Sequence, residues 1–264
     1  MKKFVTLFFV LITLLIPFSS INIAYAEEKP MLAIVIDDFG QSRRGVEAML
    51  NTKCTLTCAI MPGLDYSKQD AENAHEKGHE VILHMPMEAH VKLPDSWYGP
   101  KVIRNYDTPQ KAKAMLSECI DATPHCVGVN IHIGSGVCLN KKLITAILEE
   151  ARDKGKYFLD SKTNEGSVCA DVAPATNADF VQRDFFLELT GAPSYEHSVN
   201  ELKKATQLVK KQGYAIAIGH VGPEGGNSTA KAIADSIARI EAEGVQIVPL
   251  SKIVEKLNLN HHKA

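Results

Sequence analysis

Residues 31–40 read Met31-Leu-Ala-Ile-Val-Ile-Asp-Asp-Phe-Gly40, and this stretch decides the fold class. Its apolar run, residues 32–36, is typical of a strand buried on both faces, as in a parallel sheet covered by helices. Gly40 then turns the chain away from the strand. Ligand sites in parallel α/β folds gather at the carboxyl ends of the strands, so we expect Asp37 and Asp38 at a functional edge.

Two adjacent carboxylates repel each other, and a cation nearby would compensate them. A divalent metal that takes one carboxylate and leaves the other as a base meets that need. A solvated turn, in which Asp38 caps a helix that begins near Ser42, accounts for the pair equally well. The pair alone leaves both interpretations open.

Length, composition and charge limit the class of protein. The 264 residues suit one large α/β domain, and barrels of roughly 250 residues are common. The net charge is −2 with neutral His and no basic stripe is present, so nucleic-acid binding has little support. No GxGxxG follows the first strand and no GxxxxGKS/T occurs, so nucleotide binding has no motif either.

The first 26 residues have the pattern of an export signal. Met1-Lys-Lys precedes an almost wholly apolar run from Phe4 to Phe18, and Ala24-Tyr-Ala26 forms a small-x-small cleavage site. We expect cleavage after Ala26 rather than a retained anchor, a mature domain of residues 27–264, and a periplasmic or extracellular location. We find no later segment long enough to span a membrane.

Six cysteines follow the cleavage site, and an oxidising compartment would allow them to pair. Cys119 and Cys126 bracket the end of a predicted helix, which makes a local disulfide between them feasible. Cys54 and Cys58 are expected to serve as core residues. No CxxC occurs, so a zinc site made of cysteines is not predicted.

Apolar strands alternate with amphipathic helices along the chain. Such units favour parallel strands with right-handed crossovers, and seven or eight of them favour a closed or nearly closed barrel in a single domain. Thr108-Pro109 is a good helix start, with Thr as cap and Pro in the first turn. The expected strands are 31–37, 54–61, 80–85, 127–133, 157–161, 179–187, 214–219 and 245–250. The expected helices are 42–51, 66–77, 108–122, 140–154, 194–211 and 229–243, with a last short helix after them.

Polar residues collect at the carboxyl ends of these strands. A single His there is more often structural, whereas three His with several carboxylates at one rim indicate a metal site. Asp with two His is an ordinary zinc ligand set that leaves a position open for water. The polar residues at the rim are Asp37, Asp38, His84, Glu88, Asn130, His132, Asp160 and His220.

The segment His75-Glu-Lys-Gly-His79 matches HExxH, a metalloprotease motif that needs both His on one helical face. Gly78 is expected to close the helix, and both imidazoles fall at the amino end of the next strand, far from the functional rim. We therefore reject the protease assignment.

Five stretches, in order, resemble the divergent polysaccharide deacetylase family. They are Ile36-Asp-Asp-x-Gly40, Leu83-His-Met-Pro-Met-Glu88, Val127-Gly-Val-Asn-x-His-x-Gly-Ser135, Phe158-Leu-Asp-Ser-x-Thr163 and Ile218-Gly-His220. Each is weak alone, but the five together are specific and cover nearly all of the mature chain. The resemblance implies a distorted (β/α) barrel of about seven parallel strands. It also implies a metal-dependent hydrolase that removes acetyl groups from an envelope or extracellular glycan.

The resemblance further implies a role for each matching residue. Asp37 resembles the general base of the deacetylases, and His220 resembles the His that protonates the leaving group. Asp38, His84 and His132 resemble the ligands of a Zn²⁺ ion, or of another divalent transition metal.

The match departs from the family pattern around two of these ligands. Glu88 stands where typical deacetylases have a second His, so His132 is the expected replacement, while Glu88 either binds the metal or orients a ligand. Ile131 and Ile133 flank His132, where the family usually shows Asn and Met. Because of this second departure, the substrate contacts of the family do not carry over directly to this chain.

Four further residues are expected near the site. Asn130 and Asp160 would contact the ligands or the substrate, with Asp160 fixing a charged neighbour. Trp97 and Tyr98, on the long loop after strand 80–85, either stack on a sugar face or anchor the loop. Two rival functions also remain: a non-catalytic envelope protein that retains a metal or sugar pocket, and a metal-dependent esterase or amidase for a non-sugar substrate.

Overall fold

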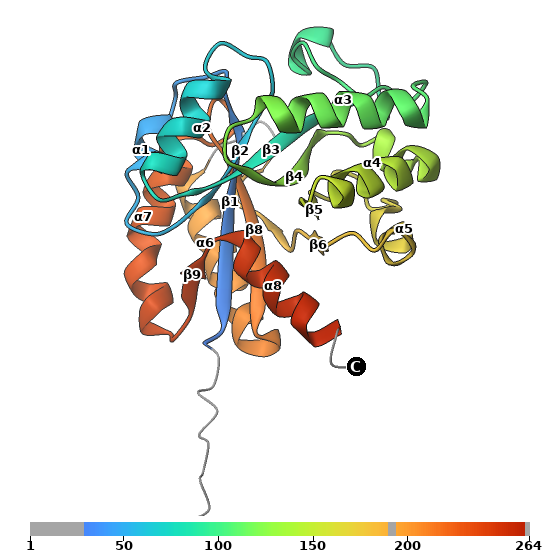
Figure 1. Ribbon diagram of the computed structural model, residues 1–264. Coiled ribbons are helices and arrows are strands. Elements are labelled where there is room, and N and C mark those ends of the chain that lie inside the picture. The colour runs from blue at the N-terminus through green and yellow to red at the C-terminus, as the bar shows by residue number, and fades with distance from the viewer. Residues whose placement is uncertain (1–28, 190–193, 262–264) are drawn as a thin grey trace, which may run out of the picture.

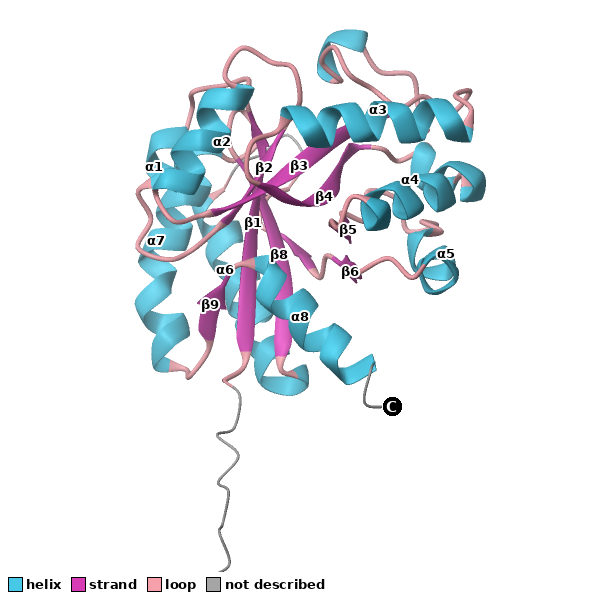
Figure 2. Ribbon diagram, in the orientation of Figure 1, coloured by secondary structure: helices cyan, strands magenta, loops and turns pink. Residues whose placement is uncertain are grey.

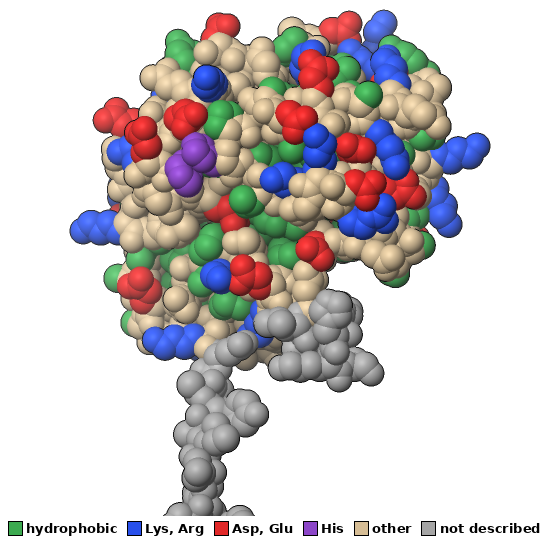
Figure 3. All heavy atoms as spheres, viewed as in Figure 1, with side chains coloured by type: hydrophobic (Ala, Val, Ile, Leu, Met, Phe, Trp, Pro, Cys, Tyr) green, Lys and Arg blue, Asp and Glu red, His purple; other side chains and the backbone are tan. Residues whose placement is uncertain are grey.

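A computed structural model describes residues 29–189 and 194–261 of the chain. The predicted export signal, residues 1–26, lies outside the described residues. Figures 1 and 2 show a curled central sheet with helices packed around it. Across the two described ranges, no helix has the length and apolar character needed to cross a membrane. On the face shown in Figure 3, acidic and basic side chains are interspersed.

Strands and helices alternate along most of the described chain. The strands are β1 (Met31–Phe39), β2 (Thr57–Ile60), β3 (Glu80–Met87), β4 (Cys126–Ile133), β5 (Tyr157–Asp160), β6 (Phe180–Gln182), β7 (Phe185–Phe186), β8 (Tyr214–His220) and β9 (Gln246–Val248). The α-helices are α1 (Val46–Leu50), α2 (Ser67–Glu76), α3 (Pro109–Ala122), α4 (Lys141–Asp153), α5 (Cys169–Thr176), α6 (Tyr195–Gln212), α7 (Gly226–Ala242) and α8 (Leu250–His261). Two short 3₁₀ helices, η1 (Asp95–Trp97) and η2 (Val137–Leu139), lie in loops after β3 and β4.

Both faces of β1 are buried, as its continuous apolar run predicts. Leu32, Ile34 and Ile36 belong to a layer covered by helices, whereas Ala33 and Val35 belong to the opposite layer. That second layer also takes side chains from β2, β3, β5, β6, β8 and β9, and is covered by α8. Because so many strands contribute to one cluster, this layer is the interior of the curled sheet.

The sheet is parallel, in the order β6-β5-β4-β3-β2-β1-β8-β7, and β9 also pairs with β1. β6 and β7 lie at opposite ends of this order although only two residues separate them in the chain. Arg183 N donates to Asp160 O (3.0 Å), and Asp184 N donates to Ile216 O (2.9 Å). This two-residue crossing brings the ends of the sheet together and produces the distorted barrel.

Several predicted elements are confirmed by the structure. The Thr108 hydroxyl accepts a hydrogen bond from Lys111 N (3.2 Å) at the start of α3, as its capping role requires. Asn140 caps α4 in the same way, and Gly155, with φ of +65°, follows the end of that helix. Local capping chemistry therefore sets these boundaries.

Other predicted elements are wrong. The predicted strand 179–187 is broken in two, because its middle residues cross from one end of the sheet to the other. The predicted helix 42–51 begins only at Val46, since Gly45 before it has φ of +83°. A helix that was not predicted, α5, contains Pro174.

The feasible disulfide between Cys119 and Cys126 is absent, and all six cysteines are free thiols. Cys119 lies on the buried side of α3, while the Cys126 thiol donates to Gly128 O (3.1 Å) at the start of β4. Burial raises the pKa of Cys119 to about 12 and that of Cys126 to about 11. Each thiol is thus a neutral core group, like the predicted core residue Cys58.

The HExxH segment is divided as predicted. α2 ends at Glu76, and Gly78 has φ of +80°. His79 is buried between two backbone groups, because Leu56 N donates to its Nδ1 (3.1 Å) and its Nε2 lies 3.1 Å from Leu50 O. His75 instead stacks on His125, with ring centroids 3.7 Å apart. The two imidazoles therefore do not face one shared site.

Candidate metal centre

A break in strand regularity turns Asp38 toward the rim. Neighbouring residues of a strand normally point to opposite faces of a sheet. The pairing of β1 with β2 shifts between Ile36 and Phe39, and Asp38 has φ of +69°. As a result both carboxylates approach His84 Nε2, at 3.3 Å for Asp38 Oδ1 and 3.7 Å for Asp37 Oδ2.

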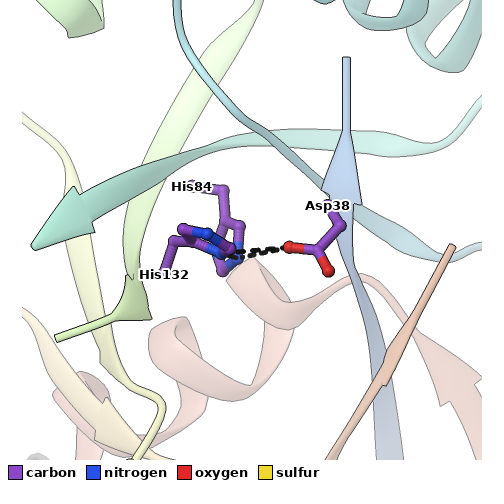
Figure 4. Close-up of side chains that lie close together, drawn as sticks. All are labelled: Asp38, His84 and His132. Carbon is purple, nitrogen blue, oxygen red and sulfur yellow. Dashed lines mark hydrogen bonds and ion pairs between the residues drawn. The ribbon is translucent and has the colours of Figure 1, made fainter. Parts of the chain in front are cut away.

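Three predicted ligands meet at this point (Figure 4). His132 Nδ1 lies 3.0 Å from Asp38 Oδ1 and 3.1 Å from His84 Nε2. His84 is buried, whereas the side chains of His132 and Asp38 are 15% and 21% exposed. The arrangement comes from β1, β3 and β4, and it leaves an approach from solvent. Asp38 is therefore not the helix cap of the rival interpretation, and α1 has no side-chain cap.

The hydrogen bonds of His84 and His132 show which nitrogen of each imidazole carries the proton. His132 Nε2 lies 3.0 Å from Trp97 O, which only accepts, and His84 Nδ1 lies 2.7 Å from Asn130 Oδ1. The outward nitrogens therefore carry the protons, and the inward nitrogens present lone pairs to Asp38. Asp38 Oδ1 is buried without a hydrogen-bond partner among the described residues. Converging lone pairs of one carboxylate and two imidazoles fit Zn²⁺ or another divalent transition metal.

Asp37 lies beside this cluster and is nearly fully buried. Asn130 Nδ2 donates to Asp37 Oδ1 (2.8 Å), so Asn130 bridges Asp37 and His84. Burial raises the pKa of Asp37, although the charges of His84 and His220 and the Asn130 hydrogen bond act against that rise. A buried carboxylate with a raised pKa is suited to accept a proton.

His220 ends β8 directly opposite Asp37, its partner in the strand register. Its Nδ1 lies 2.9 Å from Glu188 Oε2. The other carboxylate oxygen of Glu188 accepts from His220 N (3.1 Å) and Thr229 Oγ1 (2.5 Å). Burial acts to lower the pKa of His220, but the Glu188 hydrogen bond and the charges of Asp38, Glu188 and Asp37 outweigh it and raise the pKa to about 10. With Nδ1 fixed by Glu188, Nε2 is left to transfer a proton.

Sequence reasoning missed Glu188. The signal for it was a carboxylate that directly follows predicted strand 179–187, at the same rim as the other polar residues. Its partnership with His220 depends on β7 pairing with β8, and that pairing depends on the crossing at residues 183–184.

Two predicted residues lie away from the cluster. Glu88 Oε2 accepts from Asn105 N (2.8 Å), and its Oε1 lies 3.6 Å from Arg104 Nη1, so Glu88 supports a loop and is not among the three converging ligands. The Asp160 carboxylate accepts from Lys162 N (2.8 Å) and Ser167 Oγ (2.7 Å). The groups that Asp160 contacts directly are a backbone N–H and a hydroxyl, because the carboxylate closes the turn after β5. Its charge also acts on the nearby Arg183, which is the kind of charged neighbour that was expected.

Trp97 and Tyr98, in the loop after β3, were expected either to stack on a sugar or to anchor the loop, and the structure shows that they differ. Tyr98 is buried and its hydroxyl accepts from Ala89 N (3.1 Å), so it anchors the loop. Trp97 is 57% exposed and contacts His132 through its backbone carbonyl. Only Trp97 remains free to meet a ligand.

Residues 34–254 match the family described as divergent polysaccharide deacetylase. The chain belongs to this family. The matched range contains every rim residue from Asp37 to His220, which confirms the resemblance drawn from the five stretches.

Two curated relatives are similar to most of the chain. The chain is 28% identical to Uncharacterized protein YibQ of Escherichia coli K12 over 193 residues, 73% of this chain and 59% of that protein. It is 29% identical to an uncharacterized protein of Haemophilus influenzae over 206 residues, 76% of this chain and 70% of that protein. The chain thus matches less than two thirds of the E. coli relative.

The fold is similar to a solved structure, uncharacterized protein ATU2773 from Agrobacterium tumefaciens C58. The TM-score is 0.78 at 19% identity, over 86% of this chain and 90% of the other. This likeness supports the barrel described above.

Proposed function

We propose that this family member is a metal-dependent deacetylase that removes acetyl groups from a glycan of the cell envelope or its surroundings. One observation carries the proposal: Asp38, His84 and His132 direct lone pairs at one point, with Asp37 and His220 beside them on neighbouring strands. Family membership supports the hydrolytic reaction and the carbohydrate class of substrate. These five residues fit the three roles that an acetyl hydrolase of this type needs, which are metal ligand, general base and general acid.

Asp38, His84 and His132 would hold the metal, and Asp37 would act as the base. A divalent metal supplies Lewis-acid chemistry, since it acidifies a water molecule and polarises an acyl carbonyl. Asp37 takes the proton of the attacking water, because it is a buried carboxylate next to the ligands and outside their cluster. Asn130 fixes the orientation of Asp37 and of His84 at once.

His220, the strand-register partner of Asp37, completes the reaction. It gives a proton to the departing amine or hydroxyl, which leaves as a neutral group. Glu188 accepts the Nδ1–H of His220 and stabilises the charged imidazolium. Thr229 holds Glu188 in place through its hydroxyl.

Export is part of the proposal and is supported by the pattern of residues 1–26. A mature protein that begins near Glu27 is expected in its native envelope. Mass spectrometry of the recovered protein checks this, and an intact Met1 start would contradict it.

The function is tested by elemental analysis of the purified protein, together with an assay of acetate released from chitin, peptidoglycan and acetylated xylan fragments. We expect one divalent metal per chain and acetate from at least one glycan. Glycan binding without acetate release would instead support the non-catalytic alternative.

A further inference from the structure

The single Trp of the chain, Trp97, is unusually open to solvent. Tryptophan is highly buried on average in folded proteins, yet 57% of Trp97 is exposed. It is the last residue of η1, in the loop between β3 and α3. An exposed indole has a flat apolar surface, and covering that surface with a ligand is favourable.

Trp97 adjoins the metal centre through its main chain. Its carbonyl oxygen lies 3.0 Å from His132 Nε2, while the other nitrogen of that imidazole faces Asp38. Only one imidazole ring therefore separates the Trp97 backbone from the converging ligand atoms. The loop that carries the indole therefore borders the rim at which the acetyl group of a substrate would lie.

The loop around Trp97 is firmly attached, so the exposure of the indole is not a sign of a loose segment. The buried Tyr98 ring follows it directly, and the Tyr98 hydroxyl accepts from Ala89 N (3.1 Å). The Arg104 guanidinium lies over the Tyr98 ring, 4.7 Å from its centroid, and its Nη2 donates to Asp95 Oδ1 (2.8 Å). The support is preorganised, and binding would cost little additional ordering.

We propose that Trp97 is a sugar-binding platform on which a pyranose ring of the glycan stacks while a neighbouring acetyl group reaches the metal centre. The apolar C–H face of such a ring matches the indole surface, and its polar edge remains free to bind water or the rim. This inference rests on the proposed function for the nature of the ligand. Since Trp97 holds His132 through a backbone carbonyl, its side chain can be replaced without removing that contact.

Fluorescence measures ligand binding at this platform directly, because Trp97 is the only indole in the chain. In Asp37→Asn protein loaded with Zn²⁺, titration with N-acetylglucosamine tetramer or acetylated xylotetraose should change the emission in a saturable way. An emission spectrum that neither oligosaccharide alters would overturn the proposal, whether or not the wild type releases acetate. Emission that responds to phosphatidylglycerol vesicles and not to the sugars would overturn it as well.

Variants on the same loop provide the matched comparison. Trp97→Ala should raise the KM for the oligosaccharide roughly tenfold or more, as truncation of a central aromatic contact does. The loss should fall on KM more than on kcat, and the bound metal should be retained. Tyr106→Ala removes a side chain that is 78% exposed on the same loop and should change neither value.

Different results would refute the sugar platform at Trp97 and the deacetylase activity. Saturable emission without acetate release from the wild type would keep the platform and refute the deacetylase. Acetate release with an unchanged KM in Trp97→Ala would keep the deacetylase and refute the platform.

Discussion

At the scale of single residues, the candidate site depends on the backbone at Asp38. In a regular strand Asp37 and Asp38 would point to opposite faces of the sheet. The φ of +69° at Asp38 brings both carboxylates to His84. A left-handed conformation at a non-glycine residue is costly, and such strain often marks functional sites. Ile133, which directly follows His132, also has a positive φ, +59°.

Loss of either imidazole ligand is expected to empty the site. Removing an outer partner of a metal ligand alone costs about 10–100-fold in affinity, so His84→Ala and His132→Ala should cost at least that much. Elemental analysis after dialysis measures the occupancy. His75→Ala should keep full metal, because His75 contacts His125 and not the cluster. Full occupancy in both ligand variants would refute the assignment.

Glu188 is expected to act on catalysis through His220 without affecting the metal. Glu188→Gln keeps a hydrogen-bond acceptor for Nδ1 but removes the charge that stabilises the imidazolium. The rate of acetate release should fall by up to about 10²–10⁴-fold, which is the contribution of a positioned general acid. Glu201→Gln, at another buried carboxylate, one that pairs with Lys204, is the matched control and should keep the wild-type rate. Equal rates in the two variants would contradict the role of Glu188.

At the scale of elements, the junction between α2 and β3 requires a neutral imidazole. Leu56 N already donates to His79 Nδ1, so a second proton on Nδ1 would face an N–H group. Burial lowers the pKa of His79, although the hydrogen bond with Leu50 opposes the shift. As the pH falls through about 6.5, the unfolded chain therefore binds more protons at His79 than the folded protein does.

Acid should consequently reduce the stability that His79 contributes. The free energy of unfolding should be higher for wild type than for His79→Gln at pH 7.5, and the gap should narrow toward pH 5. Urea denaturation at a series of pH values measures it, and the difference between the two proteins removes the effect of the other histidines. His75→Gln serves as control, since His75 is exposed and stacks on His125. A gap that stays constant with pH would contradict this account.

Local chemistry made some elements predictable and left others hidden. The buried run of β1, the Thr108 cap of α3 and the end of α4 near residue 154 depend on neighbouring residues, and all were predicted. The break between β6 and β7 depends on strands β5 and β8, which are far away in the sequence. In the same way, the contact of Glu188 with His220 and the contact of Trp97 with His132 join segments that are far apart in the sequence. Long-range pairing was the part that sequence patterns did not reveal.

At the scale of the whole molecule, residues 183–184 link the two ends of the curled sheet. Arg183 donates from Nε to Ser161 O (2.7 Å) and from Nη2 to Lys162 O (3.0 Å), both just after β5. Its guanidinium also lies over the Phe186 ring of β7, 3.7 Å from the centroid. Phe186 in turn packs near His220, with ring centroids 5.8 Å apart. The link between the ends of the sheet and the rim that carries the candidate site are thus physically connected.

Arg183→Ala should destabilise the fold by about 2 kcal/mol or more, since hydrogen bonds to charged groups contribute roughly 1.5–3 kcal/mol each. In a protein of this size each kcal/mol corresponds to about 2–4 °C in Tm. Calorimetry measures the shift. Arg152→Ala, which removes contacts to Thr176 O and Asp153 on the outside of the barrel, should shift Tm less. A larger effect in Arg152→Ala would contradict the closing role of Arg183.

The role of Asp37 as general base of a deacetylase is tested by comparing acetate release by wild type and Asp37→Asn at equal metal occupancy. Because Asp37 lies beside the ligand cluster and not in it, the variant should keep its fold and its metal. Its rate should fall on the order of 10²–10⁴-fold through loss of the general base. An unchanged rate in Asp37→Asn, or a wild type that binds these glycans and releases no acetate from any of them, would contradict the account.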